Sequence, residues 1–354
     1  MKRKILFVVV MTFILSVFLS SCAVNVFQTI DKPKNISDAA ESALEAANNG
    51  DTQVAANLSA QVISQVASGT TTPSPNLYEA LSSSATSSQS KETINEIASQ
   101  VEKVKMKIEN GAISQNSTTG IAVKNAAIAM IRSVSQAKKI DLSDVASKLL
   151  NVLISSSQYQ THARVFNAAD SSTFEATTAS KIVELLLSIT IDTPTMNLMS
   201  NLCDLVSVYG GDEAFNWDVS ATIYDVWYSA TALFDSNGDG VLNTSDEIFK
   251  YVWDAKNKKF KDPSQINWTE VMNLKLATYN NEALSQNVME KLSQALSKAR
   301  DALKHVPPSL NVNVSETNVF LDSLSTIYDK LNAQEIASFE TLEDLLTFLQ
   351  NSFH

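Results

Sequence analysis

The sequence has few of the residues that enzymes and zinc proteins use for their chemistry. It contains only two cysteines and three histidines in 354 residues. It has no His-x-x-x-His spacing, no Gly-x-Ser-x-Gly turn and no glycine-rich phosphate-binding loop. We therefore expect neither a zinc site nor catalysis, and the protein is predicted not to be an enzyme.

Glycine and proline are also scarce, with eight and seven copies in the whole chain. Strand-rich proteins need more turn residues than this. Long stretches rich in Ala, Ser and Leu place apolar residues three and four positions apart, the period of a helix. The sequence predicts an all-α fold, either a multi-helix bundle or an irregular helical array with one helix-loop-helix unit.

Basic residues are outnumbered by acidic ones, 27 against 38, which gives a net charge of −11. Three of the basic residues, Lys2, Arg3 and Lys4, lie in a segment that we expect to be removed. The remaining 24 basic and 38 acidic residues give the mature chain a net charge of −14. This charge argues against nucleic-acid binding and against electrostatic docking on anionic lipid.

The N-terminus has the pattern of a secretory signal peptide. Lys2-Arg3-Lys4 precedes an apolar run from Ile5 to Leu19, and small residues follow. The run is shorter than the roughly 20 apolar residues of a membrane-spanning helix. Residues 19–22, Leu-Ser-Ser-Cys, resemble the lipobox of bacterial lipoproteins.

That resemblance implies cleavage before Cys22, diacylglycerol on its thiol and acylation of the new N-terminus. Two or more acyl chains form a stable membrane anchor. We therefore expect an extracytoplasmic protein of the cell envelope, attached to a membrane through Cys22. A plain signal peptide with a Cys at its cleavage site is the alternative. With Cys22 acylated, Cys203 is the only mature thiol, so no intramolecular disulfide is possible.

Residues 235–247, Asp-Ser-Asn-Gly-Asp-Gly-Val-Leu-Asn-Thr-Ser-Asp-Glu, place oxygen-bearing side chains at closely spaced positions around a glycine. This stretch resembles the calcium loop of EF-hand proteins, in the spelling typical of dockerins. Calcium takes six to eight oxygen ligands, and Gly240 permits the sharp bend. The resemblance implies Ca²⁺ held by side chains of Asp235, Asn237, Asp239, Asn243 and Asp246, with the Val241 carbonyl as a further ligand.

The last ligand position departs from the EF-hand pattern, which has a bidentate Glu there. Either Asp246 closes the loop, as in dockerin-type loops, or a one-residue expansion lets Glu247 do so. We favour Asp246. An Asp/Asn/Gly-rich turn without an ion is the other alternative. Residues 254–265 cannot form a second loop because Lys occupies its third and fifth positions, so a complete dockerin and cohesin binding are not supported.

Composition divides the chain into segments. Ser and Thr supply 12 of the 23 positions in 68–90, which predicts a linker. Ser37, Asp51 and Ser90 are predicted helix caps, and Pro194 is predicted in the first turn of another helix. We predict a signal peptide at 1–21, a tether at 22–36, a helical hairpin at 37–67, the linker at 68–90 and an α-helical domain at 91–354 with the calcium loop at 235–246. Near the end we expect a basic turn at 256–262 and closing helices at 316–331 and 333–350.

Segment 215–268 holds 11 of the 26 aromatic residues, including all four Trp. One interpretation is a ligand pocket lined by Trp217, Trp253 or Trp268. The other is a hydrophobic core under the calcium loop, and the three- and four-residue spacing favours it. In that core, Trp227 and Phe234 are expected to meet Ile248, Tyr251 and Val252.

The function expected from these features is structural. Calcium would brace a helical body that a lipid anchor holds at the cell envelope, without catalysis. The alternatives are a ligand-capture (solute-binding) lipoprotein and a helical scaffold for protein partners.

Overall fold

A computed structural model describes residues 35–69, 76–82, 87–140, 191–211, 213–257, 259–308 and 314–352. Cys22, the signal peptide and residues 22–34 of the tether lie outside this part, as do residues 141–190. Helices make up nearly all the regular structure of the described residues, so the predicted all-α fold is confirmed.

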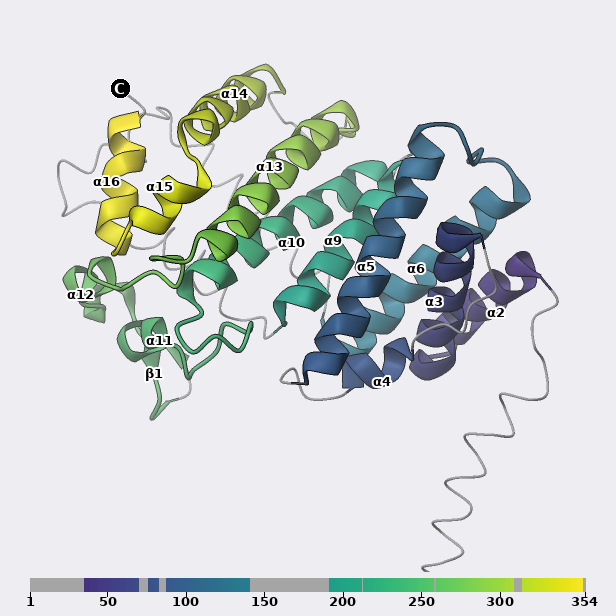
Figure 1. Cartoon of the computed structure of the whole chain (residues 1–354), viewed down its shortest axis with the longest axis horizontal. Coiled ribbons are helices and arrows are strands. Elements are labelled where there is room, and N and C mark those ends of the chain that lie inside the picture. Colours follow the sequence, from purple (N-terminus) through teal and green to yellow (C-terminus); the bar gives the residue numbers. More distant parts are fainter. Residues whose placement is uncertain are drawn as a thin grey trace, which may run out of the picture.

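The helices form an array that runs from the N-terminal α2 at one end to the C-terminal α16 at the other (Figure 1). The first group contains α2 (Ile36–Asn48), α3 (Thr52–Ser68), α4 (Leu77–Ser82), α5 (Ser88–Glu109) and α6 (Thr118–Lys138). The middle contains α9 (Thr193–Ser207), α10 (Ala214–Phe234) and α13 (Glu282–Lys304). The last group contains α14 (Val314–Lys330), α15 (Ala333–Ser338) and α16 (Leu342–Ser352).

A small unit separates α10 from α13. It contains α11 (Glu247–Val252), strands β1 (Trp253–Asp254) and β2 (Lys259–Phe260), a 3-10 turn (Pro263–Gln265) and α12 (Trp268–Met272). The two strands pair antiparallel, with Trp253 opposite Phe260. The basic turn predicted at 256–262 is therefore part of a short hairpin, whose aromatic cross-strand pair stabilises it.

Several helices begin at side-chain caps. Asp51 accepts a hydrogen bond from the Val54 N–H, as predicted. The caps of α2 and α5 are Asn35 and Ser87, so the prediction of Ser37 and Ser90 was wrong by two and three residues. Pro194 lies in the first turn of α9, where its missing N–H has no helical partner to lose.

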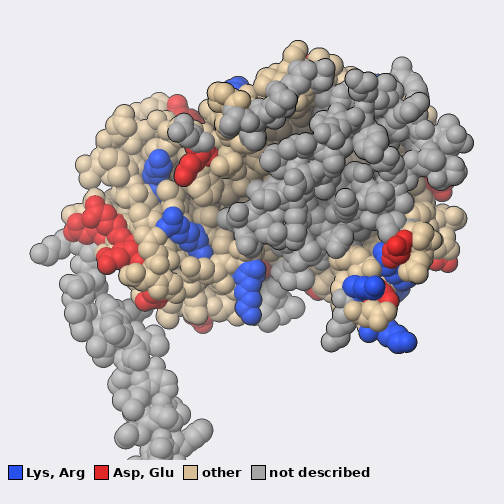
Figure 2. Space-filling model, turned by 180° about the vertical axis from the view of Figure 1, so that it is seen from behind, with Lys and Arg blue, Asp and Glu red and all other residues tan. Residues whose placement is uncertain are grey.

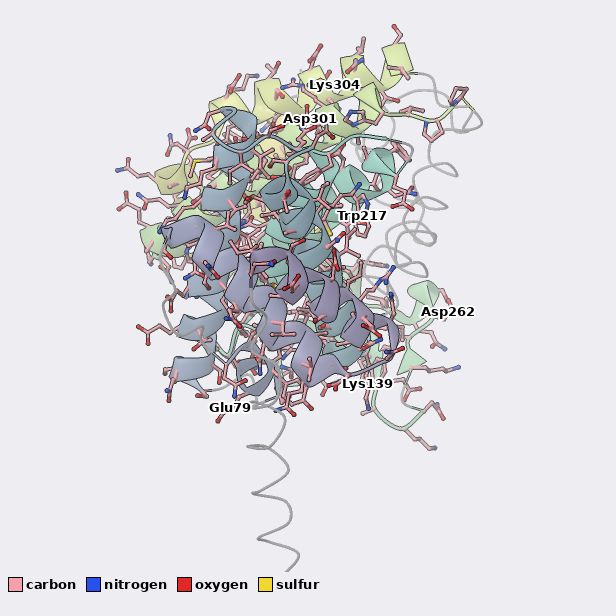
Figure 3. The ribbon with its side chains drawn as sticks, turned by 90° about the vertical axis from the view of Figure 1, so that its right-hand side faces the viewer. Glu79, Lys139, Trp217, Asp262, Asp301 and Lys304 are labelled. Atoms are coloured by element: carbon pink, nitrogen blue, oxygen red, sulfur yellow. The ribbon has the colours of Figure 1, made fainter. Side chains whose placement is uncertain are left out.

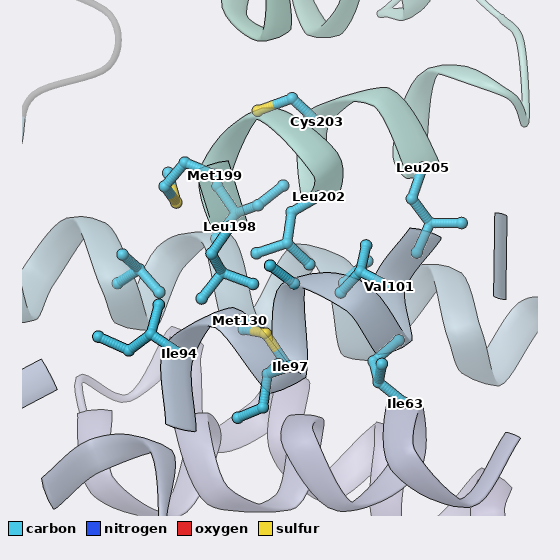
Figure 4. Packing of buried hydrophobic residues seen from close by; sticks show 14 of the residues in the cluster. Ile63, Ile94, Ile97, Val101, Met130, Leu198, Met199, Leu202, Cys203 and Leu205 are labelled. Carbon is cyan, nitrogen blue, oxygen red and sulfur yellow. The ribbon is translucent and has the colours of Figure 1, made fainter. Parts of the chain in front are cut away.

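The main hydrophobic core lies between α3, α5, α6, α9 and α10 (Figure 4). Ile63, Ile97, Leu198 and Leu202 are completely buried in it. Cys203 is also buried there, and this burial raises the pKa of its thiol, which makes the thiolate inaccessible. Cys203 is therefore a small core residue, as its apolar surroundings in the sequence suggest.

The predicted N-terminal hairpin shares this core with the helices that follow. Helices α2 and α3 both pack on α6. Within the predicted linker, Leu77 and Leu81 of α4 are buried in the main core. The N-terminal hairpin is thus part of the same helical body.

A second, smaller core lies under residues 235–246. Leu242, Ile248, Phe249 and Val252 are buried in it with three residues of the following segment. Phe234 packs against this core, as predicted. Trp227 does not: it is buried in the main core, because it lies two helical turns before the end of α10.

Charged side chains lie on the outside of the array. Figure 3 shows Asp301 and Lys304 next to each other on α13, where they form an ion pair. On the face in Figure 2, Lys and Arg gather around the small hairpin and are scattered elsewhere. In the part of the chain that the structure describes, no helix has the length and apolar character needed to cross a bilayer.

One exception to this distribution is a buried ion-pair cluster where α13 crosses α10. The Asp225 side chain is 0% exposed, and those of Lys291 and Lys298 are 8% and 6% exposed. Lys298 Nζ lies 2.7 Å from Asp225 Oδ2, and Lys291 Nζ lies 3.4 Å from Oδ1. Burial lowers the pKa of Lys291, and the charge of Asp225 opposes that shift.

We predict that Asp225→Asn lowers the free energy of unfolding by about 3–5 kcal/mol, because two buried ammonium groups lose their common counter-charge. Urea unfolding would measure the change. Asp322→Asn is the matched control, since Asp322 pairs with Arg300 at the surface and its side chain is 72% exposed. Surface pairs contribute about 0–1 kcal/mol, so equal losses in the two variants would contradict a structural role for the buried cluster.

Candidate metal centre

Residues 235–246 form a compact loop between the last turn of α10 and the first turn of α11. Gly238 and Gly240 both have positive φ, +76° and +83°. At Gly240 the chain also approaches α9, because a Cβ atom there would lie 3.1 Å from Thr193 Oγ1. The bend that the sequence predicts at Gly240 is present.

The side-chain oxygens of the loop turn inward onto its backbone. Asp235 accepts hydrogen bonds from the N–H groups of Gly238 and Gly240 through its two oxygens, at 2.8 and 2.7 Å. Asn237 Oδ1 accepts from the Asp239 N–H at 2.8 Å, and Asp239 Oδ1 accepts from the Val241 N–H at 2.8 Å. Each oxygen still has a second lone pair available for a ligand.

Asp246 is the buried residue of the set, with 0% of its surface exposed. One carboxylate oxygen accepts from the Ser236 N–H and hydroxyl, and the other accepts from the Asn243 N–H. No ion pair to Asp246 exists among the described residues. Burial raises the pKa of Asp246, the hydrogen bonds from the backbone oppose the rise, and the charge of Asp235 adds to it.

The two candidates for the closing ligand differ in position. The Asp246 carboxylate connects both ends of the loop, from Ser236 to Asn243. For Glu247, the contact within the loop comes from its backbone N–H, which donates to Ser236 Oγ. The geometry therefore favours Asp246 over Glu247.

Asn243 occupies the space between two other predicted ligands. Its Nδ2 donates to Asp239 Oδ2 at 3.2 Å and to the Val241 carbonyl at 3.0 Å, and its Oδ1 accepts from the Ser245 N–H. The partly positive amide NH₂ thus bridges two oxygens that a cation would also bridge. Ion binding would replace these two hydrogen bonds.

The loop is fixed to the helical body at three points. Lys91 Nζ, at the start of α5, donates to the Asp239 carbonyl at 2.7 Å. The Thr193 N–H, at the start of α9, donates to the Gly240 carbonyl at 2.9 Å. Leu242 anchors the other side in the small core. A change in the loop would therefore reach α5, α9 and α11.

The predicted ligands are carboxylate, amide and carbonyl oxygens, and this donor set limits which metal ion the loop can hold. Among the described residues, no three His, Cys, Asp or Glu side chains form a group that could hold a metal ion. The loop instead combines carboxylates with two Asn side chains and a backbone carbonyl. An all-oxygen donor set of this kind suits a hard cation such as Ca²⁺, and it does not suit zinc.

One polar pair was not predicted from the sequence. His305 Nδ1, at the C-cap of α13, lies 2.9 Å from Asp218 Oδ2 on α10, and the Asp218 side chain is 2% exposed. Burial raises the pKa of Asp218, while hydrogen bonds from Ser207 and His305 lower it. No hydrogen bond joins His305 to a Ser, Thr or Cys within the described ranges. The pair therefore lacks the nucleophile of a catalytic triad.

A sequence signal for this pair exists. Asp218 and Asp225 are seven residues apart on α10. Lys298 of α13 and His305, its C-cap residue, are also seven apart. Seven residues are about two helical turns. Acidic residues on one long helix and basic-type residues at matched spacing on another indicate that the helices pack antiparallel and pair these residues.

Comparison of the chain with protein-family models, with curated proteins and with solved structures finds no match.

We predict that Gly240→Ala destabilises the protein more than Gly238→Ala does. Both substitutions force alanine into the left-handed region, which costs about 1–2 kcal/mol. Only at Gly240 does the added methyl also meet a neighbour, Thr193 Oγ1, since nothing lies within 4 Å of a Cβ at Gly238. Urea unfolding of both variants measures the difference. A loss in Gly240→Ala no larger than in Gly238→Ala would mean that the contact with α9 contributes nothing.

Proposed function

We propose that this protein is a non-catalytic, calcium-binding lipoprotein of the cell envelope, in which Ca²⁺ bound at 235–246 braces the helical body. The observation that carries the proposal is the buried Asp246 carboxylate, which has no ammonium or guanidinium partner among the described residues. A buried, unpaired charge is costly, and hydrogen bonds from two N–H groups and a hydroxyl offset only part of that cost. A divalent cation bound by Asp246 together with neighbouring carboxylate, amide and carbonyl oxygens of the loop would offset the rest.

The residues proposed to hold the ion are Asp235, Asn237, Asp239, Asn243 and Asp246 through side-chain oxygens, and Val241 through its carbonyl. The orientation of Asp235, Asn237, Asp239 and Asp246 supports this assignment, because backbone N–H groups already fix their side-chain oxygens within the loop, whereas Asn243 would have to turn its amide to present its oxygen. A preorganised set of oxygens loses less conformational entropy on binding a cation.

The proposed effect of the ion is mechanical. It would fix the end of α10 relative to α11, and it would hold the Asp239 and Gly240 carbonyls against Lys91 and Thr193. Outside the cytoplasm, calcium reaches concentrations that load even weak sites. At 100 times the dissociation constant, a bound ion adds about 2.7 kcal/mol to the stability of the folded state.

The alternative of solute capture in a tryptophan-lined pocket has less support. Trp253 and Trp268 pack against the small core, and Trp217 packs against the main core. These positions agree with the expectation that the aromatic residues of 215–268 build hydrophobic cores. A helical scaffold would need a shared apolar surface for its partners. Large exposed apolar residues such as Ile121 and Val319 lie on different helices, so the scaffold alternative remains a prediction.

We expect calcium to raise the melting temperature of the full-length mature chain by several degrees relative to the same protein in EGTA. Asp239→Asn should reduce this calcium-dependent rise, because one of the three carboxylates is lost. Circular dichroism melting curves would measure both. Identical melting temperatures of the wild type in calcium and EGTA would end the calcium proposal.

Asp254→Asn is the matched control for that substitution. Asp254 also accepts N–H groups of the following residues, Lys256 and Asn257, and it lies outside the loop. Its variant should keep the full calcium-dependent rise. If Asp254→Asn and Asp239→Asn lost it equally, the effect would be nonspecific charge screening.

The lipid anchor is tested separately. In bacteria supplied with labelled palmitate, the wild type should carry the label and sediment with membranes, and Cys22→Ser should do neither. Cys203→Ala is the control, because that thiol is buried and should not affect acylation. Labelling of Cys22→Ser, or none of the wild type, would contradict acylation at Cys22.

A further inference from the structure

A polar cleft lies between α5, α9 and α13, with α10 at its base. Its volume is about 220 Å³. Eleven of its twelve lining residues are polar, and five of them are Asn or Gln. Most ligand pockets are predominantly apolar, so this composition indicates a ligand that is recognised through hydrogen bonds.

The base of the cleft contains Lys291, whose ammonium group is held by two side-chain amides and by the charge of Asp225. Its Nζ donates to Asn197 Oδ1 at 2.6 Å and to Gln294 Oε1 at 2.7 Å, and it lies 3.4 Å from Asp225 Oδ1. An ammonium group has three donors. Two of these donors are used by Asn197 and Gln294, and Asp225 compensates the charge of Lys291, so the lysine is not an uncompensated cation for an anionic ligand.

These bonds fix which atoms the amides present to the cleft. Because Lys291 can only donate, the oxygen of Asn197 must face it, and the Asn197 NH₂ is left as a donor. Asn201 has the opposite orientation: its Nδ2 donates to the Ala98 carbonyl at 3.2 Å, which leaves its oxygen as an acceptor. Residues four apart lie on the same face of a helix. A donor and an acceptor without partners among the described residues thus lie one turn apart on α9.

A hydroxyl group both donates and accepts hydrogen bonds, so neighbouring hydroxyls on one ligand would satisfy Asn197 and Asn201 together. The carboxylates of Glu102 and Glu290 line the cleft as further acceptors, and both residues are exposed, so water screens their charge. The volume holds about seven waters at roughly 30 Å³ each. We propose that this cleft binds a small neutral polyhydroxylated molecule of single-ring size, the class of the monosaccharides.

Tyr228 contributes to the base of the site as a polar group. Lys291 Nζ lies 5.7 Å from the centre of its ring, so the ammonium covers part of that ring. Because the ring is partly covered, recognition of the ligand depends on the side-chain amides. Loss of the Asn201 acceptor should therefore weaken binding. Ligand binding in the cleft does not require calcium in the 235–246 loop. Thr193 nevertheless takes part in both regions, because it lines the cleft and its N–H donates to the Gly240 carbonyl.

Saturation-transfer NMR on the mature full-length chain, with calcium in the buffer, tests the proposal. The probes are D-glucose, D-galactose and N-acetyl-D-glucosamine at millimolar concentration, with spermidine as a cationic probe and inorganic phosphate, followed by ³¹P line broadening, as an anionic one. At least one neutral sugar should receive saturation, and spermidine and phosphate should give no response. Response from spermidine or phosphate alone, or no response from any sugar, would overturn the proposal.

Two variants locate the binding. Ser99→Trp places a large side chain in the cleft from an exposed position on α5 and should abolish the sugar signal. Ser293→Trp, exposed on α13 but outside the cleft, should retain it. Should Ser99→Trp fail to fold, Asn287→Trp blocks the cleft from α13. Asn201→Leu should weaken binding at least tenfold, and sugar signals unaffected by the blocking variants would place binding elsewhere and reject the cleft.

Discussion

The arrangement of the helices depends on the buried carboxylate of Asp225. It sits between two lysines that lie about two turns apart on the same face of α13, and all three side chains are at least 90% buried. Hydrophobic contacts alone would let α13 slide along α10 at modest cost, because apolar surfaces are not directional. Buried charges are different, since a shift of one turn would leave an ammonium or a carboxylate without a partner. The cluster therefore fixes the register of the two helices.

Other features of the protein follow from that register. Lys298 also donates to Ser200 of α9, and Asp204 of α9 accepts from Lys105 of α5, so the polar network extends across four helices. The end of α10 then enters the candidate calcium loop at a fixed position beside Thr193. Lys291, held by Asp225, in turn orients the amides of the cleft. The loop and the cleft are thus two consequences of one set of buried contacts.

The sequence predicted the helical fold because that information is local: apolar spacing and the scarcity of glycine and proline describe each helix separately. It also placed Asp51 and Pro194 correctly, since caps act within one turn. Near Asn35 and Ser87, several Ser and Asn residues could each be the N-cap. Which of them caps the helix depends on backbone angles that cannot be read from the sequence. The periodicity also predicted Trp227 in the core under the loop, but it lies two helical turns before the end of α10 and is buried in the main core.

The candidate calcium loop could be predicted because all its ligands lie within twelve consecutive residues. The cleft could not, since it combines side chains from four helices, and lysines such as Lys291 normally indicate a solvated helix face. What distinguishes Lys291 is a counter-charge 66 positions earlier in the chain, which only the folded structure brings to it. The same reasoning separates the two sites physically. In the loop, the buried carboxylate of Asp246 has no ammonium or guanidinium partner among the described residues, which favours metal binding. In the cleft, the buried charge of Lys291 is compensated by Asp225, so recognition of a ligand falls to the neutral side-chain amides and to the exposed, water-screened carboxylates of Glu102 and Glu290.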